Sequence, residues 1–97
     1  MTVEPSELTL ANVERFSILA KTLSYENYLR NVVDGGTALS YKNGVRRCLI
    51  EFYNSGEVWI MLYERFSVKK PEIHEVKNNP ECYSNLVKEI KFYLGEP

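Results

Sequence analysis

Residue types that support catalysis or metal binding are few in this sequence and do not cluster. His74 is the only histidine and stands in the segment EIHEV, between Glu72 and Glu75. A zinc site needs three or four ligands at defined spacing, and the patterns HxxxH, HExxH and CxxC are all absent. We therefore interpret His74 as an exposed residue of an edge strand, with a metal ligand or a general base as the alternative roles.

The remaining reactive side chains also lack a catalytic pattern. Cys48 and Cys82 are interpreted as buried structural thiols. Asp34, the only aspartate, is expected to bond to backbone beside the glycines that follow it. The stretch VVDGGTALS matches neither GxGxxG nor GxxxxGK[ST], and no pattern favours a paired-carboxylate site, although one stays open. We expect no enzyme activity, no cofactor and no metal site.

Helical spacing of apolar residues predicts a helix near each end of the chain. The segment TLANVERFSILAKTL has its apolar residues three or four apart, with Thr9 as the expected N-cap. The segment SYENYLRNVVDGG is expected to continue it, as one kinked helix or as a second helix ended by glycine. In NNPECYSNLVKEIKFYLG, Asn79 is expected to cap a helix that starts at Pro80 and stops at Gly95.

Between the helices the apolar residues alternate, which predicts antiparallel strands. Asn43-Gly44 predicts a two-residue hairpin turn that pairs Lys42 with Val45. The segment NSG at 54–56 predicts a three-residue turn that pairs Tyr53 with Glu57. Because Pro71 cannot occupy a central strand, residues 72–76 are expected to form a short edge strand or an extended loop.

The second turn assigns the side chains of this hairpin to two faces. One face is an ordinary core, made by the pairs Phe52–Val58, Ile50–Ile60, Cys48–Leu62 and Arg46–Glu64. The other face is a mixture of aromatic, aliphatic and charged side chains: Arg47, Leu49, Glu51, Tyr53, Trp59, Met61, Tyr63 and Arg65. A register slip of one residue would exchange the two faces.

The predicted class is α+β, as a single domain over residues 1–97. We expect two layers: an antiparallel sheet of three or four strands, with the N-terminal helix or helix pair and the C-terminal helix on one face. Apolar residues make up 44% and charged residues 26%, which are ordinary values for a globular protein. The chain has no apolar run near the ~20 residues of a membrane span and no basic segment before a hydrophobic one at its N-terminus. We expect a cytoplasmic protein without a membrane partner.

The second sheet face has three candidate roles. Aromatic residues, Met and Arg are enriched at protein interfaces, so we expect this face to bind a protein partner, either a second copy as a homodimer or another chain. The predicted partner-binding residues are Arg47, Leu49, Tyr53, Trp59, Met61, Tyr63 and Arg65. The alternative is a nucleic-acid-binding module, with bases stacked on the aromatic rings. In the third interpretation, a helix or the N-terminal segment of the same chain buries this face.

Charge is unevenly distributed along the chain. The net charge is −1, but residues 37–70 carry six basic and three acidic side chains, net +3, and the segments on either side are each net −2. The basic residues of this middle third include Arg47, Arg65, Lys69 and Lys70, which are the expected phosphate contacts of the nucleic-acid alternative. The asymmetry is compatible with nucleic acid and does not by itself identify it.

Overall fold

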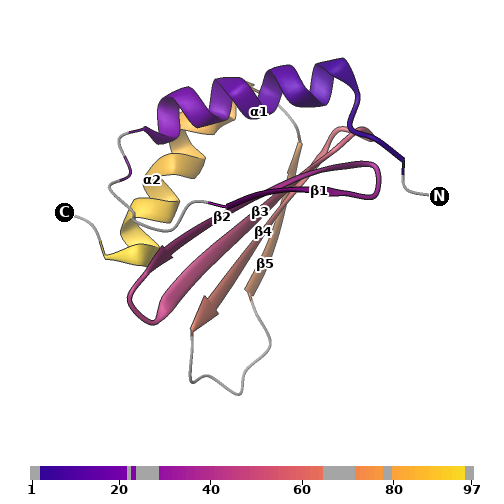
Figure 1. The fold of residues 1–97 in the computed structure, drawn as a ribbon. Coiled ribbons are helices and arrows are strands. Elements are labelled where there is room, and N and C mark those ends of the chain that lie inside the picture. Colours follow the sequence, from indigo (N-terminus) through magenta and orange to yellow (C-terminus); the bar gives the residue numbers. More distant parts are fainter. Residues whose placement is uncertain (1–2, 22, 24–28, 65–71, 78–79, 96–97) are drawn as a thin grey trace.

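A five-stranded antiparallel sheet carries both helices on one of its faces (Figure 1). The structure is a computed structural model that describes residues 3–21, 23, 29–64, 72–77 and 80–95. The strands follow one another in chain order across the sheet. The elements are α1 (Glu7–Ala20), β1 (Leu29–Val33), β2 (Gly36–Asn43), β3 (Arg46–Tyr53), β4 (Glu57–Glu64), β5 (Glu72–Lys77), the 3₁₀ turn η1 (Pro80–Cys82) and α2 (Tyr83–Leu94). The predicted α+β class with two layers is confirmed.

The predicted helical continuation into residues 29–33 is wrong, because these residues form strand β1. Val33 pairs with Gly36 across a turn made by Asp34 and Gly35, and Gly35 has a φ of +75°. Asp-Gly is a strong hairpin signal, and the helix interpretation overlooked it. This extra strand brings the sheet to five, one more than the upper expectation. Residues 24–28, which were also expected to be helical, lie outside the described residues.

The turn between β2 and β3 lies one residue further along the chain than predicted. Asn43 pairs with Arg46, so the two turn residues are Gly44 and Val45 instead of Asn43 and Gly44. Gly44 has a φ of +60°, whereas Val45 keeps a negative φ, as a β-branched residue prefers. Tyr41 consequently lies opposite Cys48. Each side chain stays on its predicted face, because the shift moves the pairing by two residues along β3.

The predicted register of β3 and β4 is confirmed. Phe52 pairs with Val58, Ile50 with Ile60 and Cys48 with Leu62. Gly56 has a φ of +89°, which is the left-handed conformation that the three-residue turn requires. The predicted edge strand over 72–76 is also confirmed as β5, which pairs with β4.

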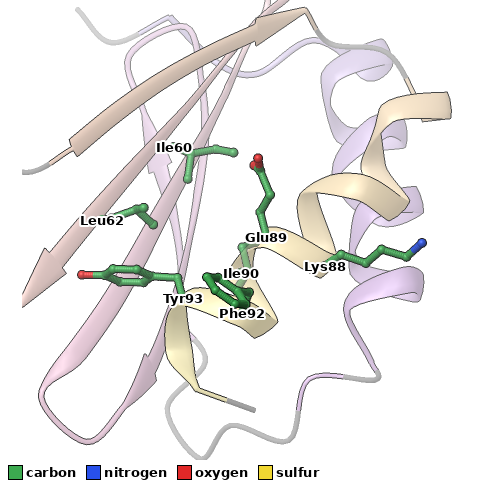
Figure 2. A pocket seen from close by; sticks show the side chains of 7 residues that line it. All are labelled: Ile60, Leu62, Lys88, Glu89, Ile90, Phe92 and Tyr93. Carbon is green, nitrogen blue, oxygen red and sulfur yellow. The ribbon is translucent and has the colours of Figure 1, made fainter. Parts of the chain in front are cut away.

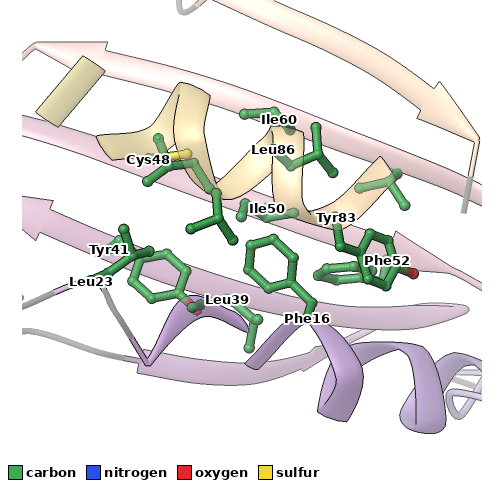
Figure 3. Close-up of a cluster of buried hydrophobic side chains, with 14 of the residues drawn as sticks. Phe16, Leu23, Leu39, Tyr41, Cys48, Ile50, Phe52, Ile60, Tyr83 and Leu86 are labelled. Atoms are coloured by element: carbon green, nitrogen blue, oxygen red, sulfur yellow. The ribbon is translucent and has the colours of Figure 1, made fainter. Parts of the chain in front are cut away.

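The core lies between the helices and the Phe52 face of the sheet (Figure 3). Phe16 of α1 is fully buried at its centre, with its ring centroid 5.5 Å from that of Phe52 and 5.7 Å from that of Tyr83. These three residues come from α1, β3 and α2, so one aromatic cluster joins both helices to the sheet. Burial of such rings is a major source of stability in a domain of this size.

Asn54, in the β3–β4 turn, fixes the start of α1 against the sheet. Its side-chain oxygen accepts hydrogen bonds from the backbone N–H of Ser6, at 2.7 Å, and from the hydroxyl of Thr9, at 2.8 Å. Its amide donates to the carbonyl of Glu4, at 2.9 Å. The N-cap of α1 is Ser6, so the expected cap at Thr9 is wrong. The expected backbone contact of Asp34 is confirmed, because its carboxylate accepts from the N–H of Val3.

The C-terminal helix ends against the β2–β3 hairpin. Gly95 ends the helix, as predicted, and takes the left-handed conformation after the last helical residue. Asn43 and Arg46, on either side of the turn, donate to the carbonyls of Leu94 and Tyr93 respectively. The positive charge of Arg46 there complements the negative end of the helix dipole. The expected cap at Asn79 lies outside the described residues.

Candidate interaction surface

The sheet face that the described helices leave uncovered holds most of the predicted partner-binding residues. We call it the open face and define it by the side chains Lys42, Arg47, Leu49, Glu51, Tyr53, Glu57, Trp59, Met61 and Tyr63. The alternation of burial along β3 separates this face from the core, since Cys48, Ile50 and Phe52 are buried and the intervening residues are partly exposed. Both helices pack on the opposite side (Figure 1). Arg65, Lys69 and Lys70 lie outside the described residues.

The open face is arranged in rows that cross the strands. Glu51 lies opposite Trp59, Leu49 opposite Met61, and Arg47 opposite Tyr63. Successive rows are about 6.7 Å apart, the length of two strand residues. Ala38 lies opposite Glu51 in the first row and is buried. The surface of that row is therefore recessed at β2, beside larger side chains.

Carboxylates and aromatic rings share one end of the open face. The hydroxyl of Tyr53 donates to the carboxylate of Glu51, and the indole N–H of Trp59 donates to Glu57 at 3.0 Å. Each bond joins residues two apart on one strand, which therefore point the same way. These contacts orient the two rings and concentrate negative charge at this end.

Positive charge marks the other end of the same face. The guanidinium of Arg47 lies over the ring of Tyr63, with its central carbon 4.6 Å from the ring centroid. Lys42 lies opposite Arg47 on β2 and is exposed. The hydroxyl of Tyr63 donates to the sulfur of Met61 at 3.7 Å, which connects this end to the apolar row between the two charged ends. A cation stacked on an aromatic ring is a common arrangement in binding sites.

Tyr53 is held in its protonated form. Partial burial, the hydrogen bond to Glu51 and the negative charges of Glu51 and Glu57 raise the pKa of Tyr53 to about 12. A phenol with this pKa neither gives up nor accepts a proton readily near neutral pH, so it is poorly matched to acid–base catalysis. It is well suited to remain a fixed hydrogen-bond donor, which favours a binding role for this end of the face.

A second candidate site lies in the helix layer, where α2 crosses β4 (Figure 2). It is a cleft of about 430 Å³ lined by Ile60, Leu62, Lys88, Glu89, Ile90, Phe92 and Tyr93. Tyr93 forms one wall, and its hydroxyl donates to the carbonyl of Tyr63 at 2.9 Å. The lining is mainly apolar, and it carries no group of His, Cys, Asp or Glu that would hold a metal.

Three strongly exposed apolar side chains on the helices were missed by sequence reasoning. Phe92 of α2 is 87% exposed, and Leu8 and Ile18 of α1 are 72% and 62% exposed. The helical stripe identified in the sequence includes none of them, because they lie outside the spacing of the buried residues. Single exposed apolar side chains are common on protein surfaces, and these three belong to two separate helices.

The described residues hold no candidate metal centre: His, Cys, Asp and Glu nowhere gather in a group of three or more. His74 lies in edge strand β5, where it pairs in register with Ile60. Its side chain lies outside the described residues. No described helix is both long enough and apolar enough to cross a membrane.

The two cysteines have different environments. Cys48 is fully buried, as predicted, but Cys82 is exposed, so the prediction that both are buried is wrong. Cys82 directly precedes α2, and the buried side of that helix begins only at Tyr83. Burial, together with the negative charge of Glu89, raises the pKa of the Cys48 thiol to about 12.

A thiol reagent is therefore expected to modify one cysteine per chain in the native state, and that cysteine is Cys82. Cys82→Ser should abolish the rapid reaction, and Cys48→Ser should leave it unchanged, as measured by absorbance with an aromatic disulfide. Rapid modification of both thiols in the native protein would contradict the burial of Cys48.

The buried thiol of Cys48 also makes the stability of the protein depend on pH. Since the pKa of Cys48 is raised from 9.0 to about 12, its stabilising contribution is complete below pH 9 and is lost as the pH rises through 12. Denaturant unfolding between pH 8 and 11 should show a smaller loss of stability in Cys48→Ala than in the wild type. Equal losses in the two proteins would exclude this cause.

Comparison of the chain with protein-family models, with curated proteins and with solved structures finds no match to any of them.

Proposed function

We propose that this protein is a small, non-enzymatic interaction module that binds a protein partner through its open face. The observation that carries the proposal is the sheet itself: both described helices cover one face, and the other presents aligned aromatic, aliphatic and charged side chains. An antiparallel sheet with one face in water usually has polar residues on that face. Here Leu49 and Met61 occupy its central row instead, with Trp59 in the row beside it.

The types of residue on the open face resemble the core and rim of a protein interface. Leu49, Met61 and Trp59 are partly exposed apolar side chains, and charged groups stand at both ends. Tryptophan, tyrosine and arginine are the residues that most often dominate binding energy. The hydrogen bond from Trp59 to Glu57 and the stacking of Arg47 on Tyr63 hold these side chains in place before binding, which lowers the entropy cost of association.

Nucleic acid is the weaker candidate for the same face. Stacked bases would suit Tyr53, Trp59 and Tyr63, but two of these rings are hydrogen-bonded to carboxylates. Glu51 and Glu57 would repel phosphates at that end. Binding to single-stranded oligonucleotides, if it occurs, should weaken steeply with salt.

The proposal is tested by comparing three bait proteins in an extract of the native host. Trp59→Glu places a charge beside the central row of the open face, and Ile18→Glu is the matched control at an exposed apolar residue of α1. We expect Trp59→Glu to retain at least tenfold less of a bound protein than the wild type, because loss of a hot-spot residue costs about 2 kcal/mol or more. Ile18→Glu should retain as much as the wild type.

Both the captured protein and the captured nucleic acid are measured, and the far-ultraviolet circular dichroism of each bait confirms its fold. Equal capture of every protein by the wild type and Trp59→Glu would overturn the proposal. Loss of nucleic acid instead of protein in Trp59→Glu would favour the nucleic-acid alternative.

A further inference from the structure

We propose that the partner is a second copy of this chain, packed open face to open face about a two-fold axis that crosses the strands at the level of Leu49 and Met61. This inference rests on the proposed function, since it specifies the partner of the same surface. It is carried by the distribution of charge on the open face, which is complementary to itself in one orientation and repulsive in the other.

The charges on the open face are separated along the strand direction. Arg47 and Lys42 lie in the row on one side of Leu49 and Met61, and Glu51 lies in the row on the other side. Glu75 of β5 pairs with Trp59 in the acidic row, and Glu57, in the next row, pairs with Lys77 of β5. Along β3, Arg47 and Glu51 are each two residues from Leu49. The apolar row is therefore midway between opposite charges.

Two face-to-face arrangements of identical sheets combine two-fold symmetry with aligned strands. With the axis parallel to the strands, each end meets the same end of the second copy, so Arg47 and Lys42 approach their own equivalents and Glu51 and Glu57 approach theirs. With the axis across the strands, the basic end of one copy meets the acidic end of the other. Because juxtaposed like charges cost several kcal/mol, the second arrangement is favoured.

The favoured arrangement also pairs the remaining side chains by type. Rotation about this axis places each strand over the same strand of the second copy. Arg47 then lies opposite Glu51 of the second copy, and Tyr63 lies opposite Trp59 of the second copy. Leu49 and Met61 meet their own equivalents at the centre. The result is an isologous interface with an apolar middle, two aromatic pairs and two ion pairs.

The groups that would form the ion pair have free bonding capacity in the single chain. The carboxylate of Glu51 accepts one hydrogen bond from Tyr53, and a carboxylate has about four acceptor positions. The ring of Tyr63 covers a face of the Arg47 guanidinium, whose N–H donors lie in its plane. Neither side chain has to give up its present contact to meet the other.

The size of the sheet fits such an interface. Strands of five to eight residues, spaced about 4.8 Å apart with a rise of about 3.3 Å per residue, give a projected area of roughly 550 Å². Protruding side chains increase the accessible area, and a standard interface buries about 800 Å² per partner. Sheets packed face to face lie about 10 Å apart, a spacing that aromatic side chains fill.

The test uses sedimentation equilibrium on charge-reversed full-length chains. The wild type is expected to be a dimer at micromolar concentration. Arg47→Glu and Glu51→Arg should each weaken the dimer at least tenfold, because each replaces two opposite-charge contacts with like-charge contacts. Mixing the two variants should restore association, since each supplies the charges that the other needs.

The double variant R47E/E51R should likewise recover the affinity of the wild type to within about threefold. Arg47 and Glu51 are about 13 Å apart along one strand, so this recovery would not come from a contact within a single chain. Arg15→Glu, a charge reversal on the exposed side of α1, is the control and should leave the dimer unchanged.

Three results would overturn the inference. The first is a wild type that stays monomeric up to about 500 μM, which would be a very weak affinity for an interface of this size. The others are a dimer whose affinity is unchanged by both single charge reversals, and two weakened variants whose association is not restored when they are mixed. If the wild type is monomeric and Trp59→Glu still loses a captured protein, only the choice of partner fails. If the dimer tolerates Trp59→Glu as well as the reversals, and no captured protein depends on Trp59, the proposed function fails too.

Discussion

Replacing Phe16 with alanine is expected to lower the free energy of unfolding by about 3–5 kcal/mol, the usual cost of removing a buried aromatic ring. Domains of this size are typically stable by about 5–15 kcal/mol, so the variant should lose a large part of its stability. The ring is fully buried, and the structure surrounds it with side chains from both helices and the sheet.

The expected cost is at the upper end because of three aromatic neighbours. The ring centroid of Phe16 lies 5.5 Å from Phe52, 5.7 Å from Tyr83 and 6.4 Å from Tyr41, in tilted or edge-on geometry. Each aromatic pair of this kind contributes about 0.5–1.5 kcal/mol beyond the burial of its area. Alanine at this position would leave a cavity between α1, α2 and β3 that rigid neighbouring rings fill poorly.

Phe92→Ala is the matched control, since it removes the same side chain from the other helix where it is 87% exposed. Phe92→Ala should change the free energy of unfolding by no more than about 0.5 kcal/mol. Urea unfolding followed by tryptophan fluorescence and by circular dichroism measures both variants. Similar losses of stability in Phe16→Ala and Phe92→Ala would contradict the position assigned to Phe16.

The sequence predicts the fold best where a turn has only one favourable geometry. The NSG segment allows a three-residue turn with glycine in the left-handed conformation, and the register of β3 and β4 follows from it residue by residue. At Asn43-Gly44, two neighbouring registers both use Gly44. The predicted turn would need a positive φ at Asn43 as well as at Gly44, whereas the observed turn needs one at Gly44 alone.

Strand β1 was missed for a physical reason. Its residues Val32 and Val33 follow Leu29 at a spacing that also suits a helix, and a strand of five residues is too short for alternation to be clear. Pairing with β2 across a two-residue turn supplies the hydrogen bonds that select the strand, and the apolar spacing within residues 29–33 does not reveal that pairing. The Asp34-Gly35 turn was the available signal, because Asp-Gly between apolar runs favours a hairpin.

The composition of the open face followed from the register. Two layers with both helices on one face were expected, but the sequence alone did not exclude a helix or the N-terminal segment on the Trp59 face. An amphipathic pattern shows that a helix has an apolar side and gives no information about which face of a sheet receives it. In the structure, Phe16 and Tyr83 meet over Phe52, which brings both helices to the same face. The aromatic cluster of the core thus places both described helices on the face opposite Trp59.

Gly36→Ala is expected to lower the free energy of unfolding by about 3 kcal/mol, the upper end of the usual cost of over-packing. A Cβ atom at this position would lie 2.1 Å from the carbonyl oxygen of Phe52 and 3.2 Å from the Cα of Tyr53. Both are backbone atoms of β3, so no side chain can move aside. Strands β2 and β3 would have to separate at this point.

The sign of the change in the free energy of unfolding distinguishes a steric clash at Gly36 from the usual effect of replacing glycine with alanine. Where an alanine fits, replacing glycine stabilises a protein by about 0.4–1 kcal/mol, because the unfolded chain loses entropy. The matched control is Gly44→Ala, where nothing lies within 4 Å of the added atom but φ is +60°. There the left-handed conformation alone should cost about 1–2 kcal/mol. A neutral or stabilising Gly36→Ala would contradict the close approach of β2 and β3.

Gly36 also connects the stability of the sheet to the open face. It lies opposite Tyr53, whose hydroxyl is bonded to Glu51 at the acidic end. Separation of the strands there would displace Glu51 from the level at which a second copy would present Arg47. In folded Gly36→Ala, at a temperature well below its melting point, self-association should therefore weaken, and in Gly44→Ala it should not. Sedimentation equilibrium on the two variants measures this, and equal dimer affinities would show that the acidic end does not depend on the spacing of β2 and β3.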